Sequence, residues 1–358
     1  MMIRDLHILT FAFLLSVTLS CDRKAQYESV EDSFPIEFSL ADFSADVKGN
    51  ELTDSSIENF GVYAALGDMS ADFNEDAALV PFMANVRVAQ NNGVWSAVPN
   101  HYWPVNKVHD ISFFAYAPHL DMEAAEFSED WSSHSIVMPF SPNSNPRNQV
   151  DLLIADAALD KYREEVVLDF NHALTWVSFG ARYVSRKTPE SESMLPEGAY
   201  LRVEEVALKG VTEKMNLVYG ADGFYWDEGT AEGSSDYVLS LNKLTLADIA
   251  LDENEFKEFA SDEGALFLLP QEIDGDSVKL CVTFSYVRTT NNTKEVIGQF
   301  YSEQNLPDDI WEIGMKRKYN FIIDITTSSI VGVSAVSGGK WIEKWVPSGI
   351  TAPKFPIQ

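Results

Sequence analysis

The chain has 358 residues, with 55 Asp and Glu against 26 Lys and Arg, so its formal net charge is −29. Such a chain has no basic stripe to neutralise phosphates, which excludes nucleic acid as a partner. Cys21 and Cys281 are the two cysteines. If Cys21 is modified, no intramolecular disulfide can form, and packed hydrophobic cores have to supply the stability.

The N-terminus has the pattern of an export signal that ends in a lipidated cysteine. Arg4 supplies a positive charge, and residues 8–19 form an apolar run shorter than the roughly 20 residues that a membrane-spanning helix needs. Residues 1–21 are therefore predicted to be a lipoprotein signal peptide with its lipidated cysteine, and a lipid on Cys21, the first residue of the mature protein, would anchor the protein to a membrane. Thr18 stands where such signals usually carry Leu, so an ordinary signal peptide is the alternative.

Residues 34–40 alternate apolar side chains with other residues, which predicts a first β-strand with one buried face. The apolar side chains of this strand are Phe34, Ile36, Phe38 and Leu40.

Alternation of this kind continues along the chain and predicts half-buried strands. It is clearest at residues 278–286 and 319–325, while turn-forming residues at 220–223 and 291–292 predict hairpins. The best helical candidate, residues 244–260, carries an acidic cluster that favours a surface connector. Many strands separated by turns predict an all-β protein with two β-sandwich domains.

A division between the two domains is predicted near Lys161, where the charged run 160–165 is followed by a new strand pattern. We assign residues 49–160 to an N-terminal sandwich and residues 161–358 to a C-terminal sandwich, each large enough for its own core.

Motifs for chemistry are missing from the sequence. It contains no zinc-binding HExxH, no CxxC, no GxSxG elbow and no glycine-rich phosphate loop. The histidines lack metal-ligand spacing, and the acidic stretches beginning at Asp72 and Asp252 lack the remaining residues of a calcium loop. Cys281 is interpreted as a small structural side chain. We expect no catalytic residue, no metal and no cofactor. An enzyme, a glycosidase on a sandwich scaffold, is the least favoured of the function classes considered.

A series of short aromatic-rich segments follows in order along most of the mature chain. They are residues 59–66 (NFGVYAAL), 82–86 (FMANV), Trp95, 102–104 (YWP), 111–118 (ISFFAYAP), 151–155 (DLLIA), 168–174 (LDFNHAL) and 314–325 (GMKRKYNFIIDI). This series resembles the fimbrillin-like family, the surface lipoproteins and type V pilus subunits of Bacteroidales-type bacteria. The resemblance implies two sandwiches of transthyretin-like topology and polymerisation with other fimbrillin subunits by strand exchange.

The resemblance also implies that a protease specific for basic residues removes the first strand, and that a strand of the next subunit fills the groove. Lys48 is the one basic residue between Lys24 and Arg87. Residues 22–48 are therefore predicted to be the removable segment, processed at Lys48 by a protease of trypsin-like specificity. An ordinary exposed lysine is the alternative interpretation of Lys48.

Two C-terminal segments are candidates for the donor strand, residues 330–336 and residues 341–358. Prolines at 347, 353 and 356 interrupt the hydrogen bonding of a strand, so the second segment suits a sheet edge or an arm.

The sequence thus predicts a structural subunit or adhesin of a surface fimbria, exported as a lipoprotein and assembled by donor-strand exchange after proteolysis. A surface receptor on a host or a bacterium is a further expected partner. The alternative function is a monomeric surface lipoprotein that binds a glycan or host ligand through exposed aromatic side chains. The candidate aromatic residues are Tyr102, Trp103, Trp131, Tyr225 and Trp226.

Overall fold

The computed structural model describes residues 34–41, 57–67, 80–107, 110–120, 128–130, 135–185, 195–220, 223–241, 250–259 and 265–340. These residues form strands β1 to β22 and one turn of 3-10 helix, η1 (Pro146–Asn148), which confirms the prediction of an all-β protein. Over the same ranges, the structure has no helix long and apolar enough to cross a membrane.

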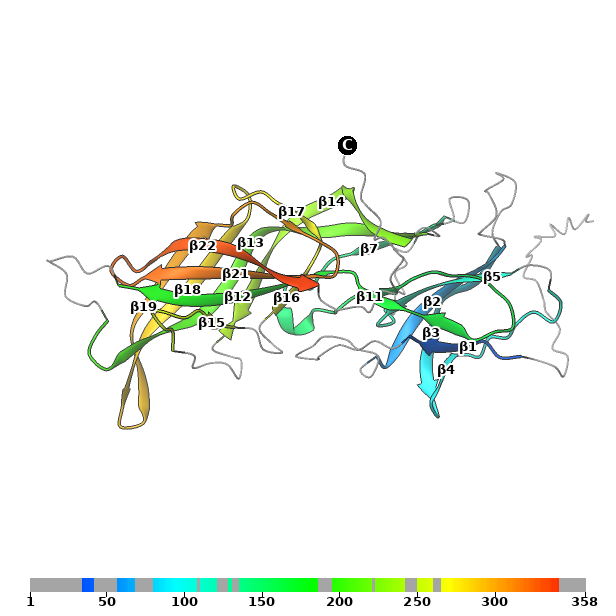
Figure 1. Ribbon diagram of the computed structural model, residues 1–358, viewed down its shortest axis with the longest axis horizontal. Helices are drawn as coiled ribbons and strands as arrows, with labels where there is room; N and C mark the ends of the chain where they lie inside the picture. The colour runs from blue at the N-terminus through cyan, green and yellow to red at the C-terminus, as the bar shows by residue number, and fades with distance from the viewer. Residues whose placement is uncertain are drawn as a thin grey trace, which may run out of the picture.

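The first sheet has nine strands in the order β10-β1-β4-β3-β2-β5-β8-β11, with β9 paired to β5 beside this path (Figure 1). The strands are β1 (Glu37–Leu40), β2 (Asn59–Leu66), β3 (Val80–Asn91), β4 (Val94–Ala97), β5 (Ile111–Ala117), β8 (Leu153–Ala155), β9 (Ala158–Lys161), β10 (Val166–Leu168) and β11 (Phe170–His172). The predicted division near Lys161 falls inside this sheet, because β10 pairs with β1 and β11 pairs with β8. The first sheet therefore continues to His172.

The second half of the chain builds two further sheets and a short ribbon. A five-stranded sheet contains β12 (Thr175–Val184), β15 (Lys257–Glu258), β16 (Ala265–Leu268), β21 (Met315–Asp324) and β22 (Ser329–Lys340). A six-stranded sheet contains β6 (Ser128–Asp130), β7 (Ser135–Phe140), β13 (Ala199–Gly220), β14 (Gly223–Ser240), β18 (Lys279–Thr290) and β19 (Thr293–Asn305). The ribbon pairs β17 (Gln271–Ile273) with β20 (Asp309–Trp311).

Strand β13 belongs to both halves of the molecule. Its residues 199–209 pair with β18, whereas residues 215–220 pair with β7, a strand from the N-terminal half of the chain. Strand β14 pairs with β13 along both parts, and Figure 1 shows the β13–β14 hairpin running from the second sandwich toward β7. The two halves are therefore joined by a continuous sheet.

Three hydrophobic clusters fill the part of the chain that the structure describes. One lies inside the first sheet around Phe60 and Phe113, and a second lies between the five-stranded and six-stranded sheets around Phe284 and Phe321. The third packs the other face of the first sheet against β7, β13 and β14. Strand β5 is buried at every residue because Phe113 belongs to the first cluster and the adjacent Phe114 to the third.

The predicted strands and hairpins are confirmed. The alternating apolar residues of the runs at 278–286 and 319–325 lie in the second cluster; they are Val278, Leu280, Val282, Phe284, Tyr286, Tyr319, Phe321, Ile323 and Ile325. Gly220 pairs with Gly223, and Thr290 pairs with Thr293 across Asn291 and Asn292. Both asparagines have positive φ, 49° and 62°, as a tight two-residue hairpin turn requires.

The helix considered for residues 244–260 is wrong for the part that the structure describes, residues 250–259. This part is irregular and contains β15, which pairs with β12. Leu251 and Phe259 are buried in the second cluster, while the acidic residues Glu253 and Glu255 are exposed. The apolar spacing therefore reflects the tertiary packing of these two side chains and not one face of a helix.

Gly210 marks the point where β13 passes from one sandwich to the other. Its φ is +81°, and the pairing register with β14 shifts between Leu208 and Val211. A Cβ atom at this position would collide with the carbonyl oxygen of Ser277. Only glycine meets both conditions, the left-handed backbone and the close approach.

Replacing Gly210 by alanine should lower the free energy of unfolding by about 2 kcal/mol or more, because the left-handed conformation alone costs roughly 1–2 kcal/mol. Gly332→Ala is the matched control, since a Cβ there meets no atom within 4 Å. Urea unfolding of the two variants measures the difference. Equal midpoints for Gly210→Ala and the unmodified protein would contradict this account of the strand.

Candidate functional site

Strand β1 is inserted between two strands that are distant from it in sequence. It pairs antiparallel with β4, with Phe38 opposite Trp95, and parallel with β10, with Phe38 opposite Val166 (Figure 1, dark blue). It makes no strand pair with β2, the next strand in the chain. Backbone pairing therefore holds β1 in place independently of its covalent connection to β2.

Residues just before β1 extend the same antiparallel pairing. The backbone N–H of Ile36 donates to the carbonyl oxygen of His101 at 2.9 Å, and the N–H of Trp103 donates to the carbonyl oxygen of Phe34 at 2.8 Å. Pro35 lies opposite Tyr102 in this bridge. We call the surface formed by β4, β10 and residues 101–103 the β1 site.

The β1 site buries two of the four predicted side chains. Ile36 and Phe38 are 1% and 2% exposed. The Phe38 ring makes T-shaped contacts with the rings of Phe60 and Phe113, each at a centroid distance of 5.8 Å. Such aromatic contacts and the burial of two large side chains are the main energetic attachment of β1. Phe113 belongs to β5, which is separated from β1 by three strands in the sheet order. The first sheet is therefore curved, so that β1 and β5 pack into one core.

The other two predicted side chains lie at the margins. Leu40 is partly buried against the same core, while Phe34 is 45% exposed. The guanidinium carbon of Arg163 lies 4.4 Å from the centre of the Phe34 ring, a cation–π distance. The alternation predicted for residues 34–40 thus describes the interior positions well and overstates the burial of the first one.

Several predicted residues lie outside the part of the chain that the structure describes. These are Cys21, Lys48, Trp131 and residues 341–358. The other donor candidate, residues 330–336, lies within β22 and pairs with β21.

The aromatic residues proposed for the ligand-binding alternative do not form one exposed surface. Trp103 and Trp226 are buried, and the Trp226 indole donates to the carbonyl oxygen of Ala173 at 2.7 Å. Tyr102 and Tyr225 are 44% and 49% exposed and belong to different elements, the β1 site and β14. Two of the four described aromatics therefore stabilise the fold.

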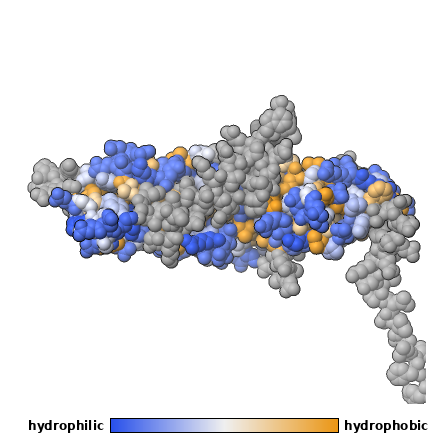
Figure 2. Space-filling view, turned by 90° about the horizontal axis from the view of Figure 1, so that it is seen from below, coloured by the Kyte–Doolittle hydropathy of each residue, from blue (hydrophilic) through white to orange (hydrophobic). Residues whose placement is uncertain are grey.

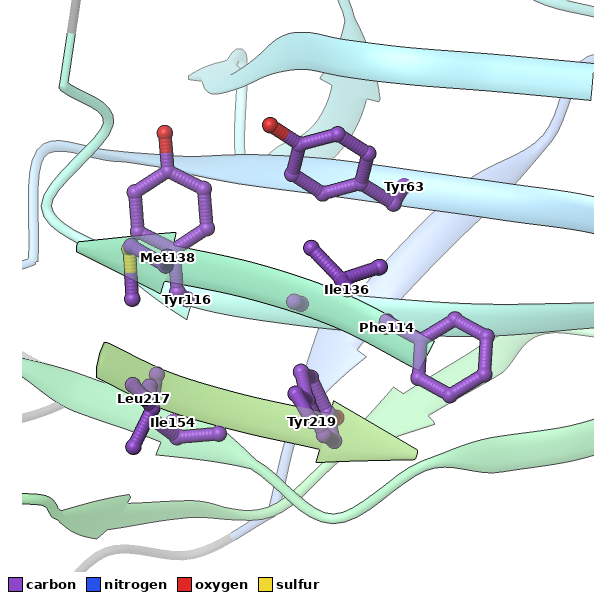
Figure 3. Close-up of a pocket in the computed structure, with 9 residues that line it drawn as sticks. Tyr63, Phe114, Tyr116, Ile136, Met138, Ile154, Leu217 and Tyr219 are labelled. Carbon is purple, nitrogen blue, oxygen red and sulfur yellow. The ribbon is translucent and has the colours of Figure 1, made fainter. Parts of the chain in front are cut away.

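The contact between the two sandwiches encloses a small apolar cavity of about 10 Å³. Figure 3 shows that side chains from different strands converge on it, including Tyr63, Phe114, Met138 and Tyr219. The Tyr219 hydroxyl donates to the carbonyl oxygen of Ala155, and burial raises the pKa of Tyr219. A cavity of this size has room for about one water molecule, so it is a packing gap and not a ligand site.

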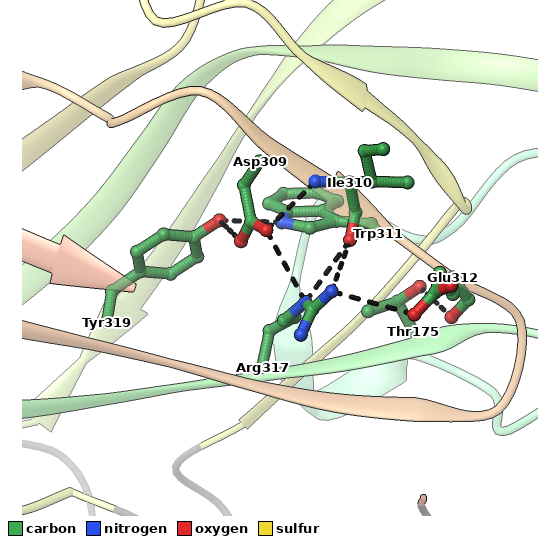
Figure 4. A network of polar contacts seen from close by, with 7 residues as sticks. All are labelled: Thr175, Asp309, Ile310, Trp311, Glu312, Arg317 and Tyr319. Carbon is green, nitrogen blue, oxygen red and sulfur yellow. Dashed lines mark hydrogen bonds and ion pairs between the residues drawn. The ribbon is translucent and has the colours of Figure 1, made fainter. Parts of the chain in front are cut away.

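A polar network around Tyr319 joins β20, β21 and β12 (Figure 4). The Trp311 indole donates to the Tyr319 hydroxyl, which donates to Asp309, both at 2.8 Å. Arg317 lies 3.6 Å from Asp309, and the Thr175 hydroxyl donates to the Glu312 carbonyl at 2.7 Å. Burial raises the pKa of Tyr319. Trp311 and Tyr319 are buried, so the network fixes strands and offers no open site for chemistry.

The remaining polar candidates also have structural partners. His172 lies 2.8 Å from Asp151 in a buried pair, and Asp252 accepts backbone bonds from Asn254 and Glu255. These bonds lower the pKa of Asp252. Cys281 is buried. Across the described ranges, no three His, Cys, Asp or Glu side chains are placed to hold a metal ion.

The described residues define an all-β protein of two connected sandwiches, in which the most distinctive feature is an inserted first strand. A family model described as fimbrillin-like matches residues 47–345, and the chain belongs to this family. Membership implies a structural or adhesive role in a fimbria at the cell surface, together with other fimbrial subunits.

Solved structures are similar to this chain. A fimbrial protein from Bacteroides vulgatus is 21% identical with a TM-score of 0.64, and the match covers 86% of this chain and 99% of that chain. A candidate cell adhesion protein from Bacteroides uniformis is 17% identical with a TM-score of 0.47, covering 88% of this chain and all of that one (100%). No curated protein matches the chain. The first similarity shows a shared fold.

Phe38→Ala should destabilise the first sandwich by about 3–5 kcal/mol, because it removes a fully buried ring and leaves a cavity. Phe34→Ala is the matched control, since the same ring is removed from a position that is 45% exposed. Hydrogen exchange of β4 and β10 measures the effect, and Phe38→Ala should lower their protection far more. Similar protection in both variants would show that β1 is not anchored by Phe38.

Stability should fall as the pH rises above about 10, because buried tyrosines resist ionisation in the folded state. Burial raises the pKa of Tyr116 from 10.0 to about 12, so the stability that it contributes is complete below pH 10.0 and is lost as the pH passes about 12. Tyr116→Phe should therefore show a shallower alkaline loss in urea unfolding than the unmodified protein. An unchanged slope would contradict the assignment to Tyr116.

Proposed function

We propose that this protein is a subunit or adhesin of a bacterial surface fimbria, exported as an outer-membrane lipoprotein and assembled by exchange of β1. The observation that carries the proposal is the pairing of β1 with β4 and β10 and not with β2. A strand held in this way can be separated by one backbone cut and then replaced by an equivalent strand.

Lys48 lies between the end of β1 at Leu40 and the start of β2 at Asn59. A cut after Lys48 by a trypsin-like protease would release residues 22–48 from the rest of the mature chain and would divide no described strand. We propose this cut as the trigger of assembly. Residues 1–21 are the proposed signal peptide with its lipidated cysteine. Cys21 would stay as the first residue of the mature protein, so its lipid would leave together with residues 22–48.

Loss of β1 would leave two kinds of unsatisfied surface. Strands β4 and β10 would expose unpaired backbone groups, and the sites of Ile36 and Phe38 would open the first core to water. Both conditions are unfavourable and both are relieved by an incoming strand with the same alternation. The transthyretin-like topology of the two sandwiches remains a prediction from the family resemblance.

Strand exchange is tested with the mature protein carrying a site for a sequence-specific protease directly after Lys48. Cleavage should convert monomers into ladders on SDS gels without heating, while uncut protein stays monomeric. The matched control carries the same protease site between β2 and β3, where a cut leaves β1 attached to β2.

A peptide that copies residues 34–40 provides the second measurement. It should bind the cut protein and suppress the ladders, because it restores the pairs with β4 and β10. Cut protein that stays monomeric and does not bind this peptide would refute strand exchange.

A further inference from the structure

The turn between β9 and β10 contacts the residue at which the β1 site begins. Strand β9 ends at Lys161 and β10 begins at Val166, so the turn consists of residues 162–165. The Arg163 side chain reaches from this turn to Phe34, and its guanidinium carbon lies 4.4 Å from the centre of the Phe34 ring. Strand β10, which follows directly, pairs with β1. One short segment therefore contacts β1 both within the sheet and at its N-terminal end.

Arg163 makes three contacts although its side chain lies at the surface. An Nη2 N–H donates to the carbonyl oxygen of Val105 at 2.6 Å. The guanidinium carbon lies 4.4 Å from the centre of the Phe34 ring and 5.4 Å from the centre of the Tyr162 ring, so two aromatic rings attract the same cation. A planar guanidinium can stack on a ring and donate hydrogen bonds at the same time. This side chain therefore ties Phe34 to the backbone of a distant segment.

Tyr162 holds the hydrogen-bond partner of Phe34. Its ring makes a T-shaped contact with Trp103 at a centroid distance of 6.3 Å, and its hydroxyl donates to the carbonyl oxygen of Val105 at 3.3 Å. The backbone N–H of Trp103 in turn donates to the carbonyl oxygen of Phe34 at 2.8 Å. The turn therefore supports both partners of this backbone hydrogen bond.

The backbone of the turn is strained at Arg163. Its φ is 51°, in the left-handed region that is unfavourable for a residue with a Cβ atom. Such a conformation persists where surrounding contacts hold it, and here the contacts are those with Val105 and Phe34. A glycine would adopt this backbone freely, but it would supply no cation. The strain indicates that this position provides a side chain and not only a change of direction.

The rest of the outer face of β1 is largely exposed. Glu37 is exposed, and Val167, which lies beside Ser39 in the sheet, is 54% exposed. Figure 2 shows apolar side chains (orange) at the surface of the right-hand half of the molecule, which holds the first sandwich in Figure 1. Pairing and buried side chains hold β1 along its length, whereas Arg163 holds its N-terminal end from outside.

We propose that Tyr162 and Arg163 form a latch that sets how fast β1 leaves its site once the backbone between β1 and β2 has been cut. The inference rests on the proposed strand exchange and adds a control to it. A cut after Lys48 frees the Leu40 end of β1 from β2, while the latch still holds the Phe34 end. Strand β1 detaches after the latch has opened, so the cut subunit keeps its core closed for longer.

The test measures release of the cut segment from the full mature chain that carries the specific protease site after Lys48. Arg163→Ala should shorten the half-life of the bound segment at least about tenfold, because the cation–π contact and the bond to Val105 are lost together. Lys161→Ala is the matched control, since it removes a neighbouring cation whose ion pair is with Glu164, at 3.8 Å. It should release the segment at the rate of the unmodified protein. Size-exclusion chromatography of protein labelled in the segment measures the rates.

A double variant tests whether Arg163 acts through Phe34. Phe34→Ala alone should also accelerate release. The effects of the two substitutions should not multiply in Arg163→Ala/Phe34→Ala, because the second substitution removes a contact that is already lost. Fully multiplied effects would contradict the latch.

Hydrogen exchange in the uncut protein gives a readout that does not depend on strand exchange. The amides of Ile36 and Trp103 bond across the β1 site, and both should exchange at least about fivefold faster in Arg163→Ala and at an unchanged rate in Lys161→Ala. Near-UV circular dichroism equal to that of the unmodified protein establishes that the variants are folded.

The possible results separate the latch from the proposed function. If Arg163→Ala leaves the release rate unchanged, the latch is wrong, and strand exchange still stands provided that the cut protein forms ladders. If cut protein neither releases the segment nor forms ladders, the proposed function is wrong. Hydrogen exchange then decides on the latch, because faster exchange in Arg163→Ala supports the hold on β1 and unchanged exchange refutes it.

Discussion

The structure of the first sandwich depends on how β1 is held. Its attachment consists of backbone pairing with β4 and β10 and of two buried side chains, Ile36 and Phe38. Burial of two such side chains contributes roughly 3–6 kcal/mol, which is comparable to the whole net stability of many domains. The core is therefore complete only when a strand of suitable pattern occupies the β1 site. If β1 is removed, as we propose, the subunit stays stable only when another strand takes its place.

The joint between the two sandwiches is built to be rigid. Strand β13 pairs with β18 in the second sandwich and with β7 beside the first, and the third hydrophobic cluster fills the contact between the two. A short flexible linker would allow the sandwiches to reorient, whereas a shared sheet and a packed core resist this motion. Such a joint suits a protein whose family assembles into surface fibres.

The sequence revealed strands better than it revealed their partners. Alternation located Ile36, Phe38 and the residues of β18 and β21 that enter the cores, because the two-residue period depends only on local backbone geometry. Which sheet a strand joins depends on pairing with strands that are distant in the sequence. The charged run at 160–165 therefore predicted a domain boundary where the structure has only a turn between β9 and β10. The continuous apolar runs of β2 and β5 were the local signs of a core on both sheet faces, because both strands are buried along nearly their whole length and contribute to two clusters.

The most direct test locks β1 in place. Glu37 lies opposite Ser96 in the antiparallel pair, so cysteines at these two positions fall within the separation that a disulfide spans. The measurement is ladder formation by Glu37→Cys/Ser96→Cys protein that has been cut after Lys48, with and without reductant. The account predicts monomers while the disulfide is intact and ladders after reduction. Equal polymerisation in both conditions would contradict the claim that β1 must leave for the subunits to join.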